Sequence, residues 1–267
     1  MENKKIKIGC FGAGQMSTAI LTRLHQQNQK YEFYCYTPSK LSAKNLAKDL
    51  NGVYVEEINL MPKDLDFYFL GFKPQNLENF YFEFNKDSIV ISMLAAKSIE
   101  EFLNKFNTQK IVRIMPNTPT LIGMGTILTV FSDCISIEER KSLNNLFDQL
   151  GKNFVLKNER QLDIATIFSG SGPALIFEMA RIFEEELLQN LNYEIEAKEI
   201  ILQTFLGSAH LMNYKSDLTF QKLKENVTSK KGVTEKALDT LNQENIQLAF
   251  KKAFNSGIKR VEELAIK

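Results

Sequence analysis

The sequence predicts an α/β fold in which a parallel sheet is followed by a separate set of helices. In the first half of the chain, short apolar segments alternate with segments of helical periodicity, which is the pattern of repeated βαβ units. After residue 159 we find no convincing strand pattern, and the apolar residues recur at helical spacing. We therefore expect a sheet domain over residues 1–157 and an all-helical domain over residues 158–267.

The strands expected in the first half are short and rich in apolar residues. They lie at residues 6–11, 31–36, 66–72, 88–93, 111–115 and 122–131, with helices at residues 16–26 and 41–50. A nearly continuous apolar run such as Phe67–Leu70 is typical of a parallel strand that is buried on both faces. Ser136 and Glu139 form the pattern of a capping box, which predicts a helix that begins there and ends near Gly151.

Two helices with wide apolar faces are expected in the second half. Residues 174–188 carry Ile176, Met179 and Phe183 on one face, and residues 246–264 repeat this arrangement. Each apolar face is nearer to half of the helix circumference than to a narrow seam. Because a section of about 110 residues is small for such faces, we expect them to be buried against a partner subunit.

The composition of the 267 residues is that of an ordinary globular protein, with 44% hydrophobic and 24% charged residues. The formal net charge of +1 gives no general attraction for nucleic acid or for an anionic membrane. No apolar run approaches the roughly 18 residues of a membrane span, and the charged start does not read as a signal peptide. Cys10, Cys35 and Cys134 are too scattered for a disulfide framework, so we expect a cytoplasmic protein.

The scarcity of histidine limits the chemistry that the chain can perform. A hydrolase triad needs a positioned histidine base, and most zinc sites need several histidine or cysteine ligands. His25 and His210 are the only two histidines, and neither lies in a metal-binding motif, so we expect no metal site. The chemistry must then come from hydroxyls, backbone amides, lysines or a bound cofactor.

The segment Gly12–Ser17 follows the first expected strand and opens the first expected helix. It matches the pattern G-x-G-x-x-(G/A), with Ser17 at the third small position. Gly12 permits a tight turn, Gly14 lets a pyrophosphate approach the backbone, and a small residue at 17 lets helix and strand pack closely. Amides at the helix N-terminus would then bind the phosphate oxygens. In this context the pattern predicts a Rossmann-type dinucleotide-binding domain, and the alternative is a glycine-rich turn that binds nothing.

The segment after the second expected strand bears on the choice between NAD and NADP. NAD sites usually have Asp or Glu there to bind the ribose hydroxyls. This chain has Thr37, Ser39 and Lys40, whose hydroxyls and ammonium group suit a 2′-phosphate. We therefore expect NADPH as the cofactor, with NADH and a plain proline-containing turn as open alternatives.

Four further segments narrow the interpretation. They read FKPQ at 72–75, RIMPNTP at 113–119, SGSGPA at 169–174 and VTSKKGVT at 227–234. In this order and at these spacings, the chain resembles the pyrroline-5-carboxylate reductases from about residue 5 to about residue 264. The resemblance implies a Rossmann domain followed by an all-α dimerisation domain that interlocks two subunits. It also implies the reduction of 1-pyrroline-5-carboxylate to L-proline by hydride transfer from NAD(P)H, the last step of proline biosynthesis.

The resemblance further implies which residues bind the cofactor. Phe11–Met16 would bind the phosphates, Thr37 would lie near the adenosine end, and Asn117 near the nicotinamide. The whole implied set is Phe11, Gly12, Ala13, Gly14, Gln15, Met16, Thr37, Ser39, Lys40, Gly71, Phe72, Lys73, Pro74, Leu94, Ala95, Ala96, Asn117 and Asn226. The alternative for Asn117 is an asparagine that satisfies a proline-rich turn.

The substrate site is implied on the loop before the penultimate helix. The positions that hold the substrate in the family match Ser229, Gly232, Val233 and Thr234. A hydroxyl and several amides before a helix suit an anion, and the Thr234 hydroxyl would orient the imine nitrogen as the catalytic residue. The alternative is a helix N-cap that binds no ligand. We expect SGSGPA to be mainly structural, with Pro173 at a helix start.

The chain also departs from the family pattern in two loops. The commoner form of the substrate loop has Pro-Gly where this chain has Lys230-Lys231, and Lys97 replaces a usual glycine in another loop. These departures bear on loop geometry and on substrate affinity, while the matched Ser, Gly and Thr remain in place.

Two alternative functions stay open at the level of sequence. A related hydroxyacid dehydrogenase would use a catalytic lysine in the helical domain, and Lys198 is available although it lies in no matching motif. A regulatory paralogue that binds NADP without catalysis is the second alternative, and the Lys230-Lys231 departure is its support. The resemblance implies a homodimer, and a higher oligomer of dimers is left open.

Overall fold

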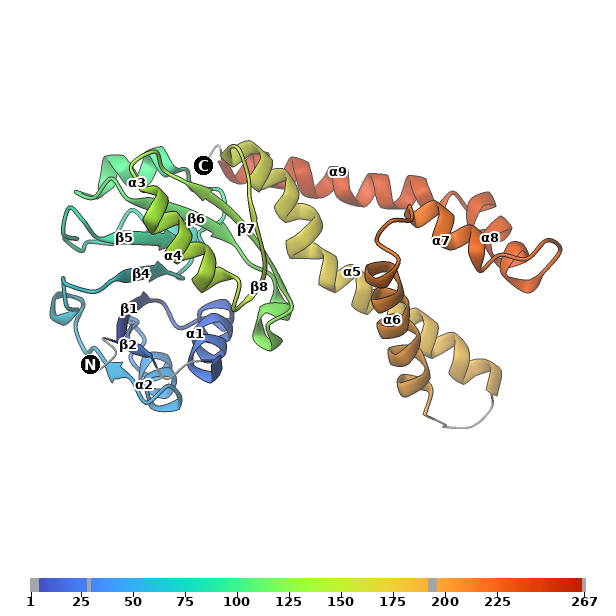
Figure 1. Cartoon of the computed structure of the whole chain (residues 1–267), viewed down its shortest axis with the longest axis horizontal. Helices are drawn as coiled ribbons and strands as arrows, with labels where there is room; N and C mark the ends of the chain where they lie inside the picture. Colours follow the sequence, from blue (N-terminus) through green and yellow to red (C-terminus); the bar gives the residue numbers. More distant parts are fainter. Residues whose placement is uncertain (1–4, 28–29, 192–195, 266–267) are drawn as a thin grey trace. The chain divides into compact units, whose positions relative to one another are not determined.

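The structure of the chain is a computed structural model that describes residues 5–27, 30–191 and 196–265. Eight strands in this part form one sheet in the order β3-β2-β1-β4-β5-β6-β7-β8 (Figure 1). Their bounds are Ile6–Phe11 (β1), Tyr31–Tyr36 (β2), Val53–Tyr54 (β3), Phe67–Leu70 (β4), Ile89–Ser92 (β5), Ile111–Met115 (β6), Gly125–Phe131 (β7) and Gly151–Val155 (β8).

The order of the first six strands is that of a Rossmann-type sheet, with the change of direction between β1 and β4. Neighbouring strands from β3 to β6 pair in parallel, whereas β7 pairs antiparallel with β6 and parallel with β8. The predicted α/β fold with a parallel sheet is therefore confirmed. The carboxyl ends of β1, β4, β5 and β6 all lie at one edge, where open α/β sheets bind ligands.

Helices cover both faces of this sheet, because its central strands are apolar on both sides. One face is packed by α1 (Gln15–Gln27), α2 (Leu41–Asp49) and α4 (Ile137–Phe147), through buried residues such as Ile20, Leu46 and Phe147. The other face is packed by α3 (Ile99–Lys105), with Phe102 fully buried. The predicted capping box of α4 is present, since Ser136 and Glu139 bond each other's backbone N–H.

The crossover from β4 to β5 contains no α-helix in the structure. After the short 3₁₀ turn η2 (Pro74–Asn76), the chain is extended, and the alternate residues Phe80, Phe82 and Phe84 turn toward the sheet. Their rings contact Phe11 at centroid distances of 5.0 Å, 5.0 Å and 6.1 Å. Aromatic side chains thus cover the area that a crossover helix would otherwise bury.

Two of the three cysteines belong to the core on the other face, which α1, α2 and α4 cover. Cys10 and Cys35 face each other across β1 and β2, and both are free and buried. Burial raises the pKa of the Cys10 thiol to about 12, which makes it a poor nucleophile at neutral pH. Cys134 is free and exposed. Cys10 and Cys35 thus behave as the sequence predicts, as small apolar residues in strands.

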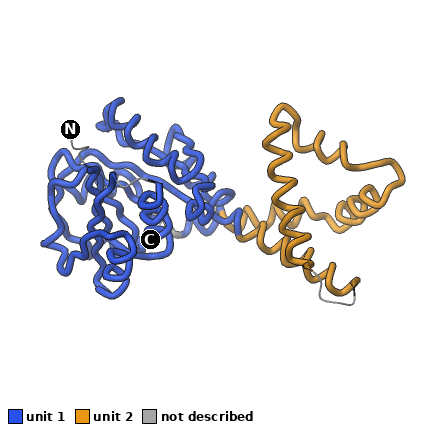
Figure 2. Tube along the Cα trace, turned by 60° about the horizontal axis from the view of Figure 1, so that its bottom comes forward, with its two compact units in different colours: residues 1–173, 258–267 blue, residues 174–257 orange. Residues whose placement is uncertain are grey.

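The second half of the chain is helical. Its helices are α5 (Glu159–Leu191), α6 (Ala197–Tyr214), α7 (Phe220–Asn226), α8 (Val233–Gln243) and α9 (Ile246–Ala265). The chain divides into two compact units, one of residues 1–173 and 258–267 and the other of residues 174–257 (Figure 2). In the described part of the second unit, Ala197 is the only buried hydrophobic residue, whereas Phe177 is 65% and Leu202 62% exposed. The apolar faces expected from the sequence are thus not covered within this unit.

Three sequence expectations differ from the structure. The helix expected to end near Gly151 ends at Phe147, and Gly151, with a φ of 148°, is instead the first residue of the edge strand β8. Pro173 lies inside α5 and not at a helix start. The first unit extends past the expected boundary at residue 157 to Pro173, because the beginning of α5 packs on the sheet through Leu162, which is fully buried.

None of the helices that the structure describes is both long enough and apolar enough to cross a membrane.

Candidate functional site

The turn between β1 and α1 is the phosphate cradle that the sequence predicts. The N–H of Gly12 donates to the carbonyl of Tyr36 at 2.9 Å, and the N–H of Gly71 donates to the carbonyl of Phe11 at 2.9 Å, which fixes the turn between β2 and β4. Within the described part of the chain, the N–H groups of Gly14 and Gln15 have no acceptor. They lie at the start of α1, where unpaired amides and the helix dipole favour an anion.

The two glycines of the cradle serve different purposes. Gly12 has a φ of 111°, and a Cβ at this position would lie 2.6 Å from the carbonyl carbon of Gly71. The protein's own packing therefore requires glycine there. A Cβ on Gly14 would meet only the carbonyl oxygen of Gly71, at an ordinary contact distance of 3.8 Å. The space beside Gly14 is left open by the protein, which fits the close approach of a pyrophosphate.

Ser17 fills the third small position of the pattern and is 1% exposed. A Cβ on Gly71 would overlap the Ser17 hydroxyl, so α1 and the end of β4 are in close contact here. A larger residue at 17 would push the helix from the sheet. The close packing of helix and sheet that the sequence predicts for a small residue at 17 is thus present in the structure.

The expected adenosine end follows β2. The Thr37 and Ser39 hydroxyls are 2.9 Å apart, and Lys40 forms an ion pair with Glu56 with an Nζ–Oε1 distance of 3.2 Å. The hydrogen bond and the charge of Glu56 raise the pKa of Lys40. Glu56 follows β3, a strand of only two residues that the sequence analysis did not identify. A strand this short leaves no recognisable pattern, so the carboxylate of Glu56 beside the expected 2′-phosphate position was not predicted. It lies there because β3 runs parallel to β2 and both strands end at the same edge of the sheet.

A cavity of about 310 Å³ opens beside the cradle. It is lined by Phe11, Gly12, Tyr36, Pro38, Ile58, Phe72, Asn76, Asn79, Phe80 and Tyr81. Phe72 stacks on Phe80 at a centroid distance of 4.9 Å, so this wall is aromatic and firmly packed. Flat apolar walls with a few amides suit a heterocyclic base. Three of these lining residues, Phe11, Gly12 and Phe72, belong to the cofactor-binding set that the sequence implies.

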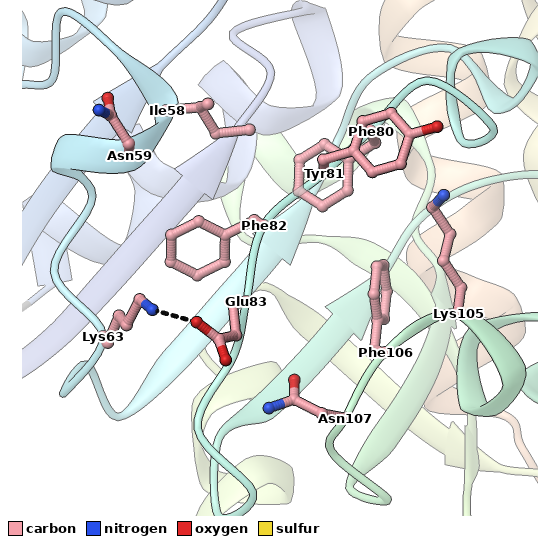
Figure 3. A pocket seen from close by; sticks show the side chains of 10 residues that line it. All are labelled: Ile58, Asn59, Lys63, Phe80, Tyr81, Phe82, Glu83, Lys105, Phe106 and Asn107. Carbon is pink, nitrogen blue, oxygen red and sulfur yellow. Dashed lines mark hydrogen bonds and ion pairs between the residues drawn. The ribbon is translucent and has the colours of Figure 1, made fainter.

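A second cavity of about 590 Å³ shares Ile58, Phe80 and Tyr81 with the first (Figure 3). Its two lysines are already engaged. Lys63 pairs with Glu83 at 2.6 Å, and Lys105 donates to the carbonyl of Glu78 at 3.0 Å. Because Lys63 is ion-paired and Lys105 already donates to a carbonyl, neither lysine of this cavity is free to bind an anion, and we assign the cavity no role.

The loops after β4 and β5 complete the edge of the sheet. Gly71–Pro74 lead from β4 into η2, and the Leu94 N–H donates to the Ser92 hydroxyl at 3.2 Å. The left-handed residue of the second loop is Ala96, with a φ of 55°, and Lys97 lies outside that region. The position at which glycine would relieve backbone strain is therefore Ala96, one residue before the lysine singled out in the sequence.

Asn117 follows β6 and is 8% exposed. Its side-chain oxygen accepts from the Thr126 N–H at 2.8 Å, and its Nδ2 donates to the carbonyl of Ser169 in α5 at 3.0 Å. The side chain thus satisfies backbone groups of β7 and α5, outside the proline-rich turn in which Asn117 lies. The expected position near a nicotinamide remains a prediction.

The implied substrate residues come together in the turn between α7 and α8, in the second unit. Gly232 is the N-cap of α8, its N–H donates to the Ser229 carbonyl at 3.0 Å, and a Cβ on it would overlap the Ser229 hydroxyl. Thr234 is the second residue of the helix. Within the described residues, the hydroxyls of Ser229 and Thr234 have no hydrogen-bond partner. Asn226, expected at the cofactor, is the last residue of α7.

The Lys230-Lys231 departure has a visible structural consequence. Lys231 has a φ of 60°, a conformation that the family's glycine adopts without strain. Its N–H donates to the Glu235 carboxylate at 2.5 Å, from the first turn of α8. This bond holds the turn in the conformation that a lysine disfavours.

The fold and the cradle define a dinucleotide-binding protein of the oxidoreductase type. A family model described as NADP oxidoreductase, coenzyme F420-dependent, matches residues 7–96, and one described as pyrroline-5-carboxylate reductase dimerisation matches residues 159–264. The chain belongs to the pyrroline-5-carboxylate reductase family.

Relatives match the chain over nearly its whole length. The pyrroline-5-carboxylate reductases of Staphylococcus epidermidis and Staphylococcus aureus are 28% and 27% identical to it, over 98% and 97% of this chain and 99% and 98% of theirs. The crystal structure of the Streptococcus pyogenes enzyme superposes with a TM-score of 0.88 at 26% identity, covering 98% of this chain and 100% of that one. The Plasmodium falciparum enzyme, solved with NADP bound, shares the fold at 24% identity, a TM-score of 0.83 and coverage of 98% and 99%.

Proposed function

We propose that the chain reduces 1-pyrroline-5-carboxylate to L-proline with NADPH as the hydride donor. The observation that carries this proposal is the intact phosphate cradle, with open space beside Gly14, in a chain that matches enzymes of this name from end to end. When bound, the dihydronicotinamide supplies the hydride, and the protein supplies binding and orientation.

The residues of the first unit fit the cofactor. The unpaired amides at the start of α1 bind the pyrophosphate, and the aromatic cavity beside Tyr36 and Phe72 holds the adenine. Thr37, Ser39 and Lys40 lie where a 2′-phosphate on the ribose would be bound.

The residues of the second unit fit the imine substrate. The first turn of α8 and the Ser229 hydroxyl bind the carboxylate, because amides at a helix N-terminus attract an anion. The Thr234 hydroxyl hydrogen-bonds the ring nitrogen. A threonine is too weak an acid to protonate the imine alone, so it orients the nitrogen or relays a proton from water.

The uncovered apolar faces of the second unit support a homodimer. Large side chains such as Phe177, Phe183 and Leu202 are about half exposed or more, and the family model that matches this region is described by dimerisation. We place the protein in the cytoplasm, as its free cysteines suggest.

An assay of NADPH oxidation with 1-pyrroline-5-carboxylate tests the proposal. Reduction of the imine is expected, and the same assay with NADH measures the cofactor preference. Oxidation of hydroxyacids in place of imine reduction would support a hydroxyacid dehydrogenase. Binding of NADPH without turnover of either substrate would support a regulatory paralogue.

Replacing Thr234 with alanine is expected to lower kcat by about a hundredfold or more, because the orienting hydroxyl is lost. Binding of NADPH, measured by fluorescence titration, should change little. Thr234→Ser is the matched control, since it keeps the hydroxyl and should retain most of the turnover. Normal turnover in Thr234→Ala would contradict the role given to this residue.

Replacing Glu56 with glutamine is expected to lower the KM for NADPH by about two- to fivefold, because Lys40 loses its competing partner. Lys40→Met should raise the KM for NADPH. Neither change should alter the KM for NADH, which carries no 2′-phosphate. Equal effects on both cofactors would show that Lys40 does not bind the 2′-phosphate.

A further inference from the structure

Helix α5 lacks one of its own hydrogen bonds. Pro173 lies inside the helix and has no N–H, so the carbonyl of Ser169, four residues earlier, has no donor in the helix. This carbonyl belongs to the first compact unit, whose longer segment runs to Pro173. Ser169 is partly buried, and a carbonyl that loses its helical donor in such a place needs another one.

Asn117 supplies that donor from a different part of the fold. Its Nδ2 lies 3.0 Å from the Ser169 carbonyl, across 52 residues of sequence. Its Oδ1 is fixed at the same time by the Thr126 N–H at 2.8 Å, which orients the amide so that the nitrogen faces α5. The side chain is 8% exposed, so water does not readily replace it.

The neighbouring hydroxyls of α5 do not take over this role. The Ser169 hydroxyl donates to the carbonyl of Ala165 at 3.1 Å, and the Thr166 hydroxyl donates to the carbonyl of Leu162 at 2.7 Å. Both are occupied one turn earlier in the helix. In the described structure, Asn117 is thus the one side chain that bonds the carbonyl freed by Pro173.

We propose that Asn117 is a positioning residue for the reaction, and that it acts by replacing the donor that Pro173 removes from α5. Asn117 follows β6 at the edge of the sheet that carries the phosphate cradle. Its bond fixes residues 169–172 of α5 against this edge. A Cβ on Gly172 would meet nothing within 4 Å, so the backbone of this fixed segment is open at that point.

A double-mutant cycle tests the bond without relying on activity. Asn117→Ala is expected to lower the urea midpoint of unfolding, because the Ser169 carbonyl loses its donor. Pro173→Ala restores an N–H to the helix. In that background, Asn117→Ala should shift the midpoint by less than half as much as in the wild type. Equal shifts in both backgrounds would overturn the proposed bond between the two positions.

Kinetics test the positioning role, and this arm rests on the proposed reductase function. Asn117→Ala is expected to lower kcat about tenfold or more through misplacement of α5, while the Kd for NADPH changes less than twofold. Asn117→Asp keeps the acceptor for Thr126 but removes the donor, and should lose kcat similarly. The exposed Asn104 of α3 provides the control Asn104→Ala, which should behave as wild type.

The outcomes separate this inference from the proposed function. An unchanged kcat in Asn117→Ala would overturn the positioning role. A weakened Kd for NADPH with an unchanged kcat would make Asn117 a cofactor ligand instead. A wild-type chain that does not reduce the imine would overturn both the function and the positioning role, while the unfolding cycle would still decide the bond.

Discussion

Replacing Gly14 with alanine is expected to abolish NADPH binding while the fold remains intact. A Cβ at this position meets only the Gly71 carbonyl oxygen at 3.8 Å, and Gly14 is not among the residues with a positive φ. The methyl group would therefore occupy the space beside the amides of α1 that we assign to the pyrophosphate. Fluorescence titration with NADPH and the thermal midpoint of unfolding measure the two effects separately.

Gly12→Ala is the matched comparison and is expected to give the opposite result. Its Cβ would lie 2.6 Å from the Gly71 carbonyl carbon and 2.7 Å from the Phe72 nitrogen, on a backbone with a φ of 111°. We expect a loss of about 3 kcal/mol in the free energy of unfolding. Wild-type affinity for NADPH in Gly14→Ala would show that no phosphate approaches this residue.

The nucleotide half of the fold could be predicted from the sequence because its signals are local. A buried parallel strand needs an apolar run, and a phosphate turn needs glycine at fixed spacing. The strand at 31–36 and the strand at 111–115 are therefore found with the predicted bounds. The capping box of Ser136 and Glu139 is another local signal, and it is present.

Features that depend on contacts distant in sequence were not predicted. β3 contains only two residues, so the carboxylate of Glu56 beside Lys40 had no recognisable signal. A proline is usually a helix boundary, yet α5 continues through Pro173, and Asn117, distant in sequence, bonds the carbonyl that the proline leaves without a helical donor. The helix α3 at 99–105 was also missed, although Ser98 and Glu101 form a capping box at its start, which is a local signal.

The implied substrate turn departs from the family pattern, and a carboxylate of the next helix compensates for the departure. The resemblance identified the replacement of Pro-Gly by Lys230-Lys231, but the sequence could not show how the turn tolerates it. The structure places the left-handed conformation at Lys231 and the compensating carboxylate at Glu235. The compensating side chain lies four residues after Lys231, in helix α8, so the motif of the turn could not predict it.

Replacing Arg113 with methionine is expected to destabilise the first unit by about 3–5 kcal/mol. Arg113 is 1% exposed in β6, and its guanidinium bonds Glu159 at 2.5 Å and Asp163 at 2.9 Å, both at the start of α5. Without the arginine, two partly buried carboxylates on successive turns of α5 would face each other and an apolar side chain. Urea unfolding of the variant measures the loss.

The triple variant Arg113→Met, Glu159→Gln and Asp163→Asn separates charge from packing. Removing all three charges leaves no unpaired carboxylate, so this variant should recover much of the stability that Arg113→Met alone loses. The recovery should be incomplete, because Glu159 also accepts the Ile99 N–H at 2.9 Å and the uncharged oxygen of a glutamine is a weaker acceptor. A loss below about 1 kcal/mol in Arg113→Met would show that the start of α5 is held by Leu162 and its apolar neighbours, with no net contribution from the ion pairs.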